Sequence, residues 1–282
     1  MKDFSVIIVT YKSYHLLRDA LWSIYAFNDI GDRLEVIVVD NSPSAEDIKI
    51  IKQEFPSVIY IENENKGFGS ANNVGASYAQ GKYLLFLNPD TLFVQPVFKD
   101  AINIFERNPR IGVFGVKLIT KEGKANQSFN FHHWLGLFKS IAQHICSPLD
   151  LFIPKHMYTC GADIFVPKKV FEDCGKFDEK IFMYGEETDL TIRINQLGYK
   201  NKYFKKYKIV HLEGGSTLSG EENKYKKMIL SYKYLSEKFS FQLIKKIKRE
   251  IRKTKIKKAI FLFDFKKNRE CSSNIAFLSS VK

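Results

Sequence analysis

Asp90 is a carboxylate placed where a predicted strand ends. It follows an apolar run, residues 84–87, that predicts a buried strand broken off by Asn88 and Pro89. In open α/β sheets, ligands bind at the carboxyl ends of the strands. A carboxylate there can hold a divalent cation against a diphosphate, because a hard cation prefers oxygen ligands and offsets phosphate charge. The alternative is that Asn88, Pro89 and Asp90 simply end the strand, since all three are common turn residues.

A second group of carboxylates lies in the first turn of a predicted helix. Glu186, Glu187 and Asp189 precede Leu190 and Ile194, which recur at helical spacing. Acidic residues stabilise a helix N-terminus electrostatically, and this is a sufficient structural explanation. Two adjacent carboxylates also repel each other, which raises the affinity of one of them for a proton. That property suits a general base.

Two sets of histidines can be considered as metal ligands. His211 follows the predicted strand 208–210 and precedes the glycine turn of residues 212–216, a position from which a neutral imidazole can ligate a metal. A lone histidine is also commonly structural, so both interpretations stay open. His132 and His133 are adjacent, so on a regular element they point in different directions and are not both expected to be ligands.

The elements that must position these groups alternate along the chain. Residues 4–11, 34–40 and 58–61 are apolar, largely β-branched runs separated by amphipathic helical patterns. This alternation predicts βαβ units and a Rossmann-like, doubly wound, mostly parallel sheet. Further strands are expected over residues 84–87, 111–116, 164–167, 202–206 and 208–210, and helices over residues 168–174 and 225–239.

A glycine turn follows the third predicted strand. Residues 63–75 contain Gly67 and Gly69, which permit tight backbone conformations, and then begin a helix whose free N–H groups suit an anion. The segment is not a Walker loop, and it differs from the Rossmann glycine pattern, which would follow the first strand. Its significance is that it is expected at the same sheet edge as Asp40 and Asp90.

An aromatic stretch interrupts the clear periodicity between residues 121 and 157. One interpretation is a small core of a second subdomain, and the other is a mobile flap with aromatic side chains that stack on sugars. Its aromatic and histidine residues are Phe129, Phe131, His132, His133, Trp134 and Phe138.

Charge divides the chain into a nearly neutral body and a basic end. Residues 1–220 carry 26 Lys and Arg against 25 Asp and Glu, a net charge of +1, whereas residues 221–282 carry 18 against 6, a net charge of +12. Around residues 240–263 apolar side chains recur at helical spacing among lysines and arginines. This pattern predicts an interfacial helix on an anionic membrane surface, or a solvated basic helix packed on the body. A nucleic-acid partner is not expected, because the basic end has no recognised reading motif.

The cysteines and the apolar runs indicate the cellular compartment in which the protein is expected. Cys146, Cys160, Cys174 and Cys271 show no CxxC pairing or zinc-like clustering, and the chain starts without a cationic and then apolar signal segment. The longest apolar runs are about a strand long, short of the roughly 20 residues that a spanning helix needs. We expect a cytoplasmic protein, with peripheral contact to the cytoplasmic face of a membrane.

Several motifs together, and in this order, resemble the family 2 glycosyltransferases, which have the GT-A fold, and in particular their bacterial rhamnosyltransferase-like branch. The resemblance covers residues 3–220. The motifs are residues 9–11, 38–42, 65–69, 72–75, 87–90, 161–162, 175–178 and 182–190, with His211, Gly214 and Ser216 closing the set.

The resemblance implies transfer of a sugar, with inversion at the anomeric carbon, from a nucleotide diphosphate donor to a hydroxyl of a glycan or lipid-linked acceptor in bacterial surface polysaccharide synthesis. The expected donor is dTDP-L-rhamnose, and next a UDP-hexose. The residues that the resemblance assigns to the base, ribose and remaining nucleotide are Thr10, Tyr11, Asp40, Asn65, Lys66, Gly67, Gly69, Asn72 and Asn88.

The metal and the base follow from two motifs that depart from the family pattern. Asn88 stands where a strict DxD motif has its first Asp, which shifts the expected Mg²⁺ or Mn²⁺ ligands toward Asp90 and His211. Glu186-Glu187 stands where the family usually has Glu-Asp. Glu187 takes the place of the usual base and Glu186 is the rival assignment.

The resulting organisation is a GT-A domain over residues 1–220 and a basic helical region over residues 221–282. Within the domain, residues 1–116 are expected to bind the nucleotide sugar and residues 117–220 to bind the acceptor and carry the base. Two alternatives are a sugar-phosphate nucleotidyltransferase, which should place a glycine-rich loop after the first strand, and a protein that binds nucleic acid through its basic end.

Overall fold

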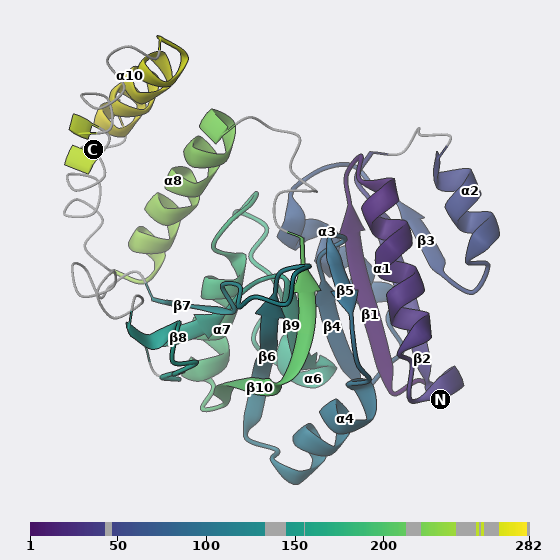
Figure 1. Ribbon diagram of the computed structural model, residues 1–282. Helices are drawn as coiled ribbons and strands as arrows, with labels where there is room; N and C mark the ends of the chain where they lie inside the picture. The colour runs from purple at the N-terminus through teal and green to yellow at the C-terminus, as the bar shows by residue number, and fades with distance from the viewer. Residues whose placement is uncertain are drawn as a thin grey trace.

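The computed structural model describes residues 1–42, 47–132, 145–154, 156–212, 221–240, 252–253, 255–256 and 265–280 (Figure 1). The elements in chain order are β1 (Phe4–Thr10), α1 (Tyr14–Ala26), η1 (Gly31–Arg33), β2 (Leu34–Asp40), α2 (Asp47–Glu54), β3 (Ile59–Glu62), α3 (Phe68–Tyr78), β4 (Tyr83–Leu87), β5 (Thr91–Phe93), α4 (Phe98–Arg107), β6 (Ile111–Ile119), β7 (Phe129–Phe131), β8 (Met157–Thr159), β9 (Asp163–Pro167), α6 (Lys168–Asp173), α7 (Glu186–Gln196), β10 (Lys200–His211), α8 (Glu221–Lys238) and α10 (Phe265–Ser280).

Within the described residues, the central sheet has eight strands in the order β3-β2-β1-β4-β9-β6-β10-β5. The strand β1 is parallel to β2 and β4, β2 is parallel to β3, and β6 is parallel to β10. Two strands run the other way: β9 is antiparallel to β4 and β6, and β5 is antiparallel to β10. The predicted α/β fold with a mostly parallel sheet is therefore confirmed.

Alternate residues of the central strands enter two different hydrophobic cores. Val6 and Ile8 of β1 pack with the helices α1, α2 and α4, whereas Ile7 and Val9 pack with α3, α6 and α7. Because both faces are covered by helices, every position of β1 and β2 is buried. This double burial explains why the sequence of these strands is a continuous apolar run.

The last strand of the sheet differs from the sequence prediction. Residues 202–206 and 208–210 are predicted as two short strands, but the structure has one strand, β10. Its register against β6 shifts between Phe204 and Lys208. Such an irregularity interrupts the alternation of side chains along a strand, so the pattern divides in two although the strand is continuous.

Part of the aromatic stretch forms a small core beside the main sheet. Phe129 and Phe131 of β7, which pairs with β8, cluster with Cys146 and Met157. His132 is buried next to them. The remaining residues of the stretch that the sequence singles out, His133, Trp134 and Phe138, lie outside the described residues.

The basic end of the chain contains the helices α8 and α10 (Figure 1). Of residues 240–263, the described part includes residues 240, 252–253 and 255–256, so the predicted interfacial helix stays a prediction. Among the described helices, none has the length and apolar character that a membrane span requires.

Candidate functional site

The carboxyl ends of β1, β2, β3 and β4 lie at one edge of the sheet because these strands are parallel (Figure 1). Thr10 pairs with Asp40, which pairs in turn with Glu62. The segment 88–90 follows directly from the end of β4. The register thus places Asp40 and Asp90 at the same edge, where ligands of open α/β sheets bind.

Asp40 is completely buried and held by two neighbours. Its Oδ1 accepts hydrogen bonds from the Ser42 backbone N–H at 2.9 Å and the Ser42 hydroxyl at 3.0 Å. The Tyr14 hydroxyl, at the start of α1, lies 3.2 Å from Oδ2. Donors on both sides fix the carboxylate in one orientation, which suits a group that recognises a base or ribose. No local pattern in the sequence indicates that Tyr14 meets Asp40.

The neighbouring residues of β1 line the same edge at different depths. Thr10 is fully buried, and its hydroxyl lies 3.1 Å from that of Ser13. Tyr11, the next residue, is 41% exposed. Of the two, Tyr11 therefore has the surface available to stack on a bound ring.

Three asparagines connect the ends of β2 and β3 to the glycine turn. Asn63 donates to Asn41 Oδ1 at 2.8 Å, and Asn41 Nδ2 lies 3.4 Å from Asn65 Oδ1. Asn65 Oδ1 in turn accepts the Gly67 backbone N–H at 3.3 Å. This series of hydrogen bonds links the carboxyl ends of β2 and β3 to Gly67, the residue before α3. The adjacent Lys66 is exposed and forms an ion pair with Glu64 at 3.0 Å.

The start of α3 fits closely against the segment that leads into α7. Gly67 has a φ of +114°, and a Cβ there would lie 2.5 Å from the Phe182 carbonyl oxygen, so the position requires glycine. Phe68 N–H donates to that same oxygen at 2.9 Å. A Cβ on Gly69 would lie 3.1 Å from Phe177 Cβ. Asn72, fully buried in α3, donates to the Phe68 carbonyl at 3.0 Å.

Asp90 and His211 face each other across the β5–β10 pair. Asp90 is 1% exposed, and His211 Nε2 lies 3.4 Å from its Oδ1. The backbone supports the approach, because His211 pairs with Thr91 and the Leu212 N–H donates to the Asp90 carbonyl at 2.9 Å. His211 Nδ1 is buried and has no hydrogen-bond partner among the described residues.

These two side chains fit a shared cation. Two ligands about 2.1 Å from an octahedral ion lie about 3 Å apart, and the separation of 3.4 Å between Asp90 Oδ1 and His211 Nε2 is close to this spacing. Within the described part of the chain, no cluster of three or more His, Cys, Asp or Glu could hold an ion. Phosphate and water oxygens would have to complete the coordination shell, as is usual for Mg²⁺.

Glu186 and Glu187 begin α7 directly after Gly185, which is left-handed with a φ of +102°. Burial, and to a lesser extent the charge of Glu187, raises the pKa of Glu186 to about 8. Glu186 is 7% exposed, and its Oε2 has no hydrogen-bond partner among the described residues. At neutral pH Glu186 is therefore mainly protonated and neutral.

Glu187 is less buried than Glu186 and is connected to the sheet edge through Gly161. Its Oε2 accepts a hydrogen bond from the Gly185 backbone N–H at 3.2 Å. A Cβ on Gly161 would lie 3.6 Å from the Glu187 side chain. Ala162 follows Gly161, and its carbonyl accepts the Asn88 N–H at 3.0 Å. The short segment 161–162 thus lies between Glu187 and the segment that carries Asp90.

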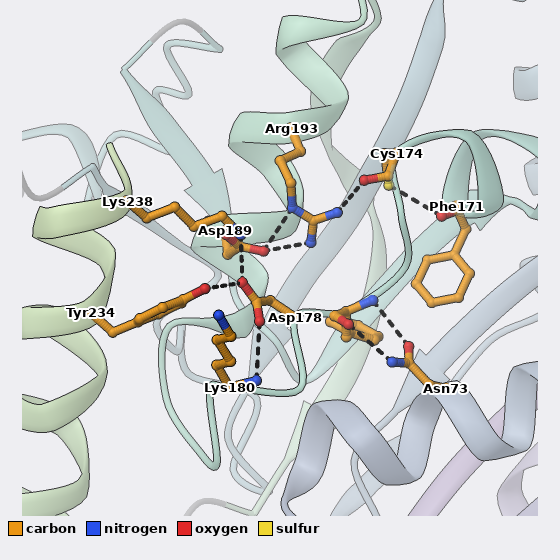
Figure 2. Close-up of polar contacts among 10 residues, drawn as sticks. Asn73, Phe171, Cys174, Asp178, Lys180, Asp189, Arg193, Tyr234 and Lys238 are labelled. Atoms are coloured by element: carbon orange, nitrogen blue, oxygen red, sulfur yellow. Dashed lines mark hydrogen bonds and ion pairs between the residues drawn. The ribbon is translucent and has the colours of Figure 1, made fainter. Parts of the chain in front are cut away.

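A charged cluster beside the glutamate pair was also not identified as a unit by the sequence analysis. Asp189 in α7 accepts from Arg193 and from the α8 residue Lys238, and Asp178 in the preceding loop accepts from Lys238 (Figure 2). The spacing of Asp189 and Arg193 on one helix is a signal for the first pair. The approach of Lys238 depends on tertiary packing and leaves no local pattern.

The chain is similar to known proteins in sequence and in structure. The family described as "Glycosyl transferase family 2" matches residues 5–165, more than half of the chain.

Three curated proteins illustrate the similarity. The minor teichoic acid biosynthesis protein GgaB of Bacillus subtilis is 29% identical over 211 residues, 71% of this chain and 22% of that protein. The low-salt glycan biosynthesis hexosyltransferase Agl10 of Haloferax volcanii is 26% identical over 207 residues, 68% of this chain and 62% of that protein. The rhamnosyltransferase WbbL of Escherichia coli is 25% identical over 221 residues, 73% of this chain and 82% of that protein. The chain therefore spans less than two thirds of GgaB and Agl10.

Solved structures show the same fold at low sequence identity. TarS of S. aureus superposes with a TM-score of 0.56 at 19% identity, over 82% of this chain and 39% of that chain. The mannosyltransferase PcManGT from Pyrobaculum calidifontis, in complex with GDP-Man and Mn²⁺, has a TM-score of 0.57 at 18% identity, over 82% and 61%. GalNAc-T7 with UDP, GalNAc and Mn²⁺ has a TM-score of 0.61 at 15% identity, over 80% and 48%.

Proposed function

The chain belongs to glycosyl transferase family 2, and on this basis we propose that it transfers a sugar from a nucleotide diphosphate donor to a hydroxyl acceptor with inversion at the anomeric carbon. The observation that carries the proposal is one sheet edge, which holds the buried Asp40 and the Asp90–His211 pair and which Glu187 approaches through Gly161. Inverting transfer needs a base on one face of the sugar and stabilisation of a leaving diphosphate on the other. The edge offers a separate group for each task.

Glu187 is the proposed base. It accepts the proton of the acceptor hydroxyl while that oxygen bonds to the anomeric carbon, and the bond from this carbon to the diphosphate breaks with its electron pair leaving on the diphosphate. Glu186 is mainly protonated near neutral pH, because burial raises its pKa to about 8. A neutral Glu186 does not repel the Glu187 carboxylate, which favours the charged form that a base requires. Glu186 remains the rival assignment, since a pKa near the working pH also suits a base.

The donor side is assigned to the other half of the edge. Tyr11 would stack on the base, the fully buried Thr10 and Asp40 would shape the wall of the base and ribose site, and the segment 65–69 with Asn72 would border the nucleotide. Asp90 and His211 would hold Mg²⁺ or Mn²⁺, and the bound cation would offset the charge of the leaving diphosphate. Two of the structural neighbours were solved with Mn²⁺, which supports this part of the proposal. Asn88 would border the same diphosphate.

The preferred donor is dTDP-L-rhamnose, with a UDP-hexose next. The similarity to WbbL, named a rhamnosyltransferase, supports the first choice, and Agl10, named a hexosyltransferase, supports the second. The acceptor is proposed to be a glycan or lipid-linked glycan of a surface polysaccharide. The names of GgaB and of the O-antigen biosynthesis protein RfbC of Myxococcus xanthus, which is 26% identical over 223 residues, support this choice.

We propose that residues 1–116 bind the nucleotide sugar, with His211 added from the later part of the chain, and that residues 117–220 bind the acceptor and carry the base. Residues 1–116 contain the groups assigned to the nucleotide sugar up to Asp90, and residues 117–220 contain the glutamate pair and His211. A separate nucleotidyltransferase activity is not proposed, because the family membership accounts for the same nucleotide site. Contact of residues 240–263 with an anionic membrane is kept as a proposal, and liposome flotation at moderate salt tests it.

A donor panel tests the proposed function. The protein is incubated with dTDP-L-rhamnose, UDP-glucose, UDP-galactose and GDP-mannose, each with Mg²⁺ or Mn²⁺, and release of the nucleoside diphosphate is measured together with thermal shift. We expect release and stabilisation with one nucleotide class, and loss of both in excess chelator. If no nucleotide sugar gives release of the nucleoside diphosphate or a thermal shift, the proposal is contradicted.

A further inference from the structure

The helix α8 packs along the segment that leads into the glutamate pair. The Ser231 hydroxyl donates to the Met183 carbonyl at 2.8 Å. Leu235, which is fully buried, approaches Gly185 so closely that a Cβ on this glycine would lie 2.8 Å from Leu235 Cδ1. The helix therefore contacts the residues immediately before Glu186 with both a hydrogen bond and apolar packing.

Charges reinforce this contact on the other side of the segment. Lys238 Nζ lies 2.6 Å from Asp178 Oδ2 and 2.6 Å from Asp189 Oδ1 (Figure 2). Tyr234, one turn earlier in α8, donates to the same Asp178 oxygen at 2.6 Å. Asp189 also accepts from Arg193 Nε at 2.8 Å. Two carboxylates and two cations thus form a neutral cluster.

The position of Lys238 matters because its two partners flank the glutamate pair in the chain. Asp178 lies before Glu186 and Asp189 lies after Glu187, so one ammonium group ties the two ends of the segment together. Asp189 is fully buried, and a buried carboxylate that loses a partner is strongly destabilised. Lysine at position 238 therefore constrains both the loop and the first turn of α7.

The opposite side of the same segment contacts α3, on the side assigned to the donor. Phe182 accepts the Phe68 N–H at 2.9 Å. Asn73 donates to the Phe177 carbonyl at 2.9 Å and accepts the Phe177 N–H at 3.0 Å. The segment 177–187 is consequently held between α3 and α8, and the glutamate pair lies at its end.

From these contacts we infer that α8 is a wall of the catalytic site and that Lys238 is a positioning residue for Glu186 and Glu187. The helix belongs to the catalytic unit in this view, although the sequence boundary at residue 220 would assign it to the basic end. The expected effect of Lys238 on catalysis rests on the proposed function. Its expected effect on the position of the segment 177–187 does not. A displacement of a reacting group by about 1 Å can cost on the order of 100-fold in rate.

The test compares Lys238→Met with Lys233→Met, which changes an exposed lysine of the same helix, and with Lys238→Arg. Hydrogen exchange is followed by mass spectrometry in peptides that contain the Phe68 and Asp189 amides, and no nucleotide sugar is needed. In Lys238→Met we expect faster exchange in both peptides and unchanged exchange in β1 and β4. In Lys233→Met we expect wild-type exchange throughout. In Lys238→Arg we expect exchange in both peptides to return toward the wild-type rate. Tyr234→Phe, which removes one donor to Asp178, should give a smaller effect at the same peptides.

The catalytic arm uses UDP-glucose or dTDP-L-rhamnose, whichever the protein hydrolyses. The kcat of Lys238→Met should fall on the order of 10- to 100-fold while the donor KM changes less than about 2-fold, and Lys238→Arg should recover most of the rate. Unchanged exchange in Lys238→Met, or equally faster exchange throughout β1 and β4, would overturn the inference. If no nucleotide sugar reacts, the proposed function fails, whereas the exchange result still decides the role of Lys238.

Discussion

His211 Nε2 lies 3.4 Å from Asp90 Oδ1, although the two residues are far apart in the chain. The approach is enforced by the backbone, because β5 begins directly after Asp90 and pairs antiparallel with the end of β10. Neither side chain needs to move to meet the other. This relationship joins the turn that follows β4 to the last residue of β10.

Asp90→Ala and His211→Ala should weaken cation-dependent donor binding. We expect a loss at least comparable to the 10- to 100-fold that outer-shell substitutions typically cost, with little change in binding measured in chelator. Calorimetric titration of the nucleoside diphosphate with and without Mn²⁺ measures both quantities. His15→Ala, which changes an exposed histidine of α1, is the control, and equal cation dependence in all four proteins would exclude Asp90 and His211 as ligands.

Asp40→Ala should raise the donor KM with a small effect on kcat. The carboxylate is held by Tyr14 and Ser42, so Tyr14→Phe, which removes one donor, should raise the KM less. A hydrogen bond contributes about 0.5–1.5 kcal/mol, which corresponds to roughly a 2- to 12-fold change. Steady-state kinetics over a range of donor concentrations measures KM and kcat separately for each variant. A change in kcat alone would show that Asp40 does not hold the nucleotide.

Glu187→Gln should abolish transfer while donor binding stays near that of the wild type. The amide keeps the shape of the side chain but cannot accept the acceptor proton at neutral pH. Glu186→Gln is the matched variant, and it should retain more activity because the wild-type carboxyl is already mainly neutral. If Glu186→Gln loses transfer and Glu187→Gln keeps it, Glu186 is the base.

The buried Glu186 should make the free energy of unfolding depend on pH. Its pKa is about 8 in the folded protein against an ordinary value of 4.5, so between these values the unfolded chain has released a proton that the folded protein keeps. The stability contribution of this group is therefore full at low pH and declines as pH rises toward 8, on the order of 1 kcal/mol per pH unit. Urea unfolding at several pH values should show that the free energy of unfolding declines less with rising pH in Glu186→Gln than in the wild type. Equal slopes of this free energy against pH in the two proteins would contradict the raised pKa of Glu186.

Gly67→Ala should destabilise the protein more than Gly123→Ala. Both glycines have positive φ, and alanine introduces backbone strain of roughly 1 kcal/mol at Gly123 and about 1–3 kcal/mol at Gly67, whose φ of 114° and ψ of 169° are nearly restricted to glycine. At position 67 the new Cβ would in addition lie 2.5 Å from the Phe182 carbonyl oxygen, whereas nothing lies within 4 Å at position 123. Chemical denaturation compares the variants, and an equal loss would show that α3 and the segment before α7 can separate without cost.

Local patterns were enough to predict the strands of the N-terminal half of the fold. The strands β1, β2 and β4 are buried on both faces, so their sequences are continuous apolar runs that end in polar turns. The same patterns predicted that Asp40, Asp90 and the glutamate pair lie at element boundaries, where the structure has them. The sequence predicted two strands where the structure has the single strand β10, because the register shift of β10 interrupts the alternation of side chains on which strand prediction depends.

What the sequence by itself determined was the order of the main elements and the polar residues at their boundaries, since hydrophobic periodicity and turn residues are local properties. The tertiary structure decided which of these residues meet. The pairing of Asp90 with His211, the contact of Tyr14 with Asp40 and the tie from Lys238 to Asp178 and Asp189 all join segments distant in the chain. Such contacts depend on sheet order and helix packing, which no local pattern encodes.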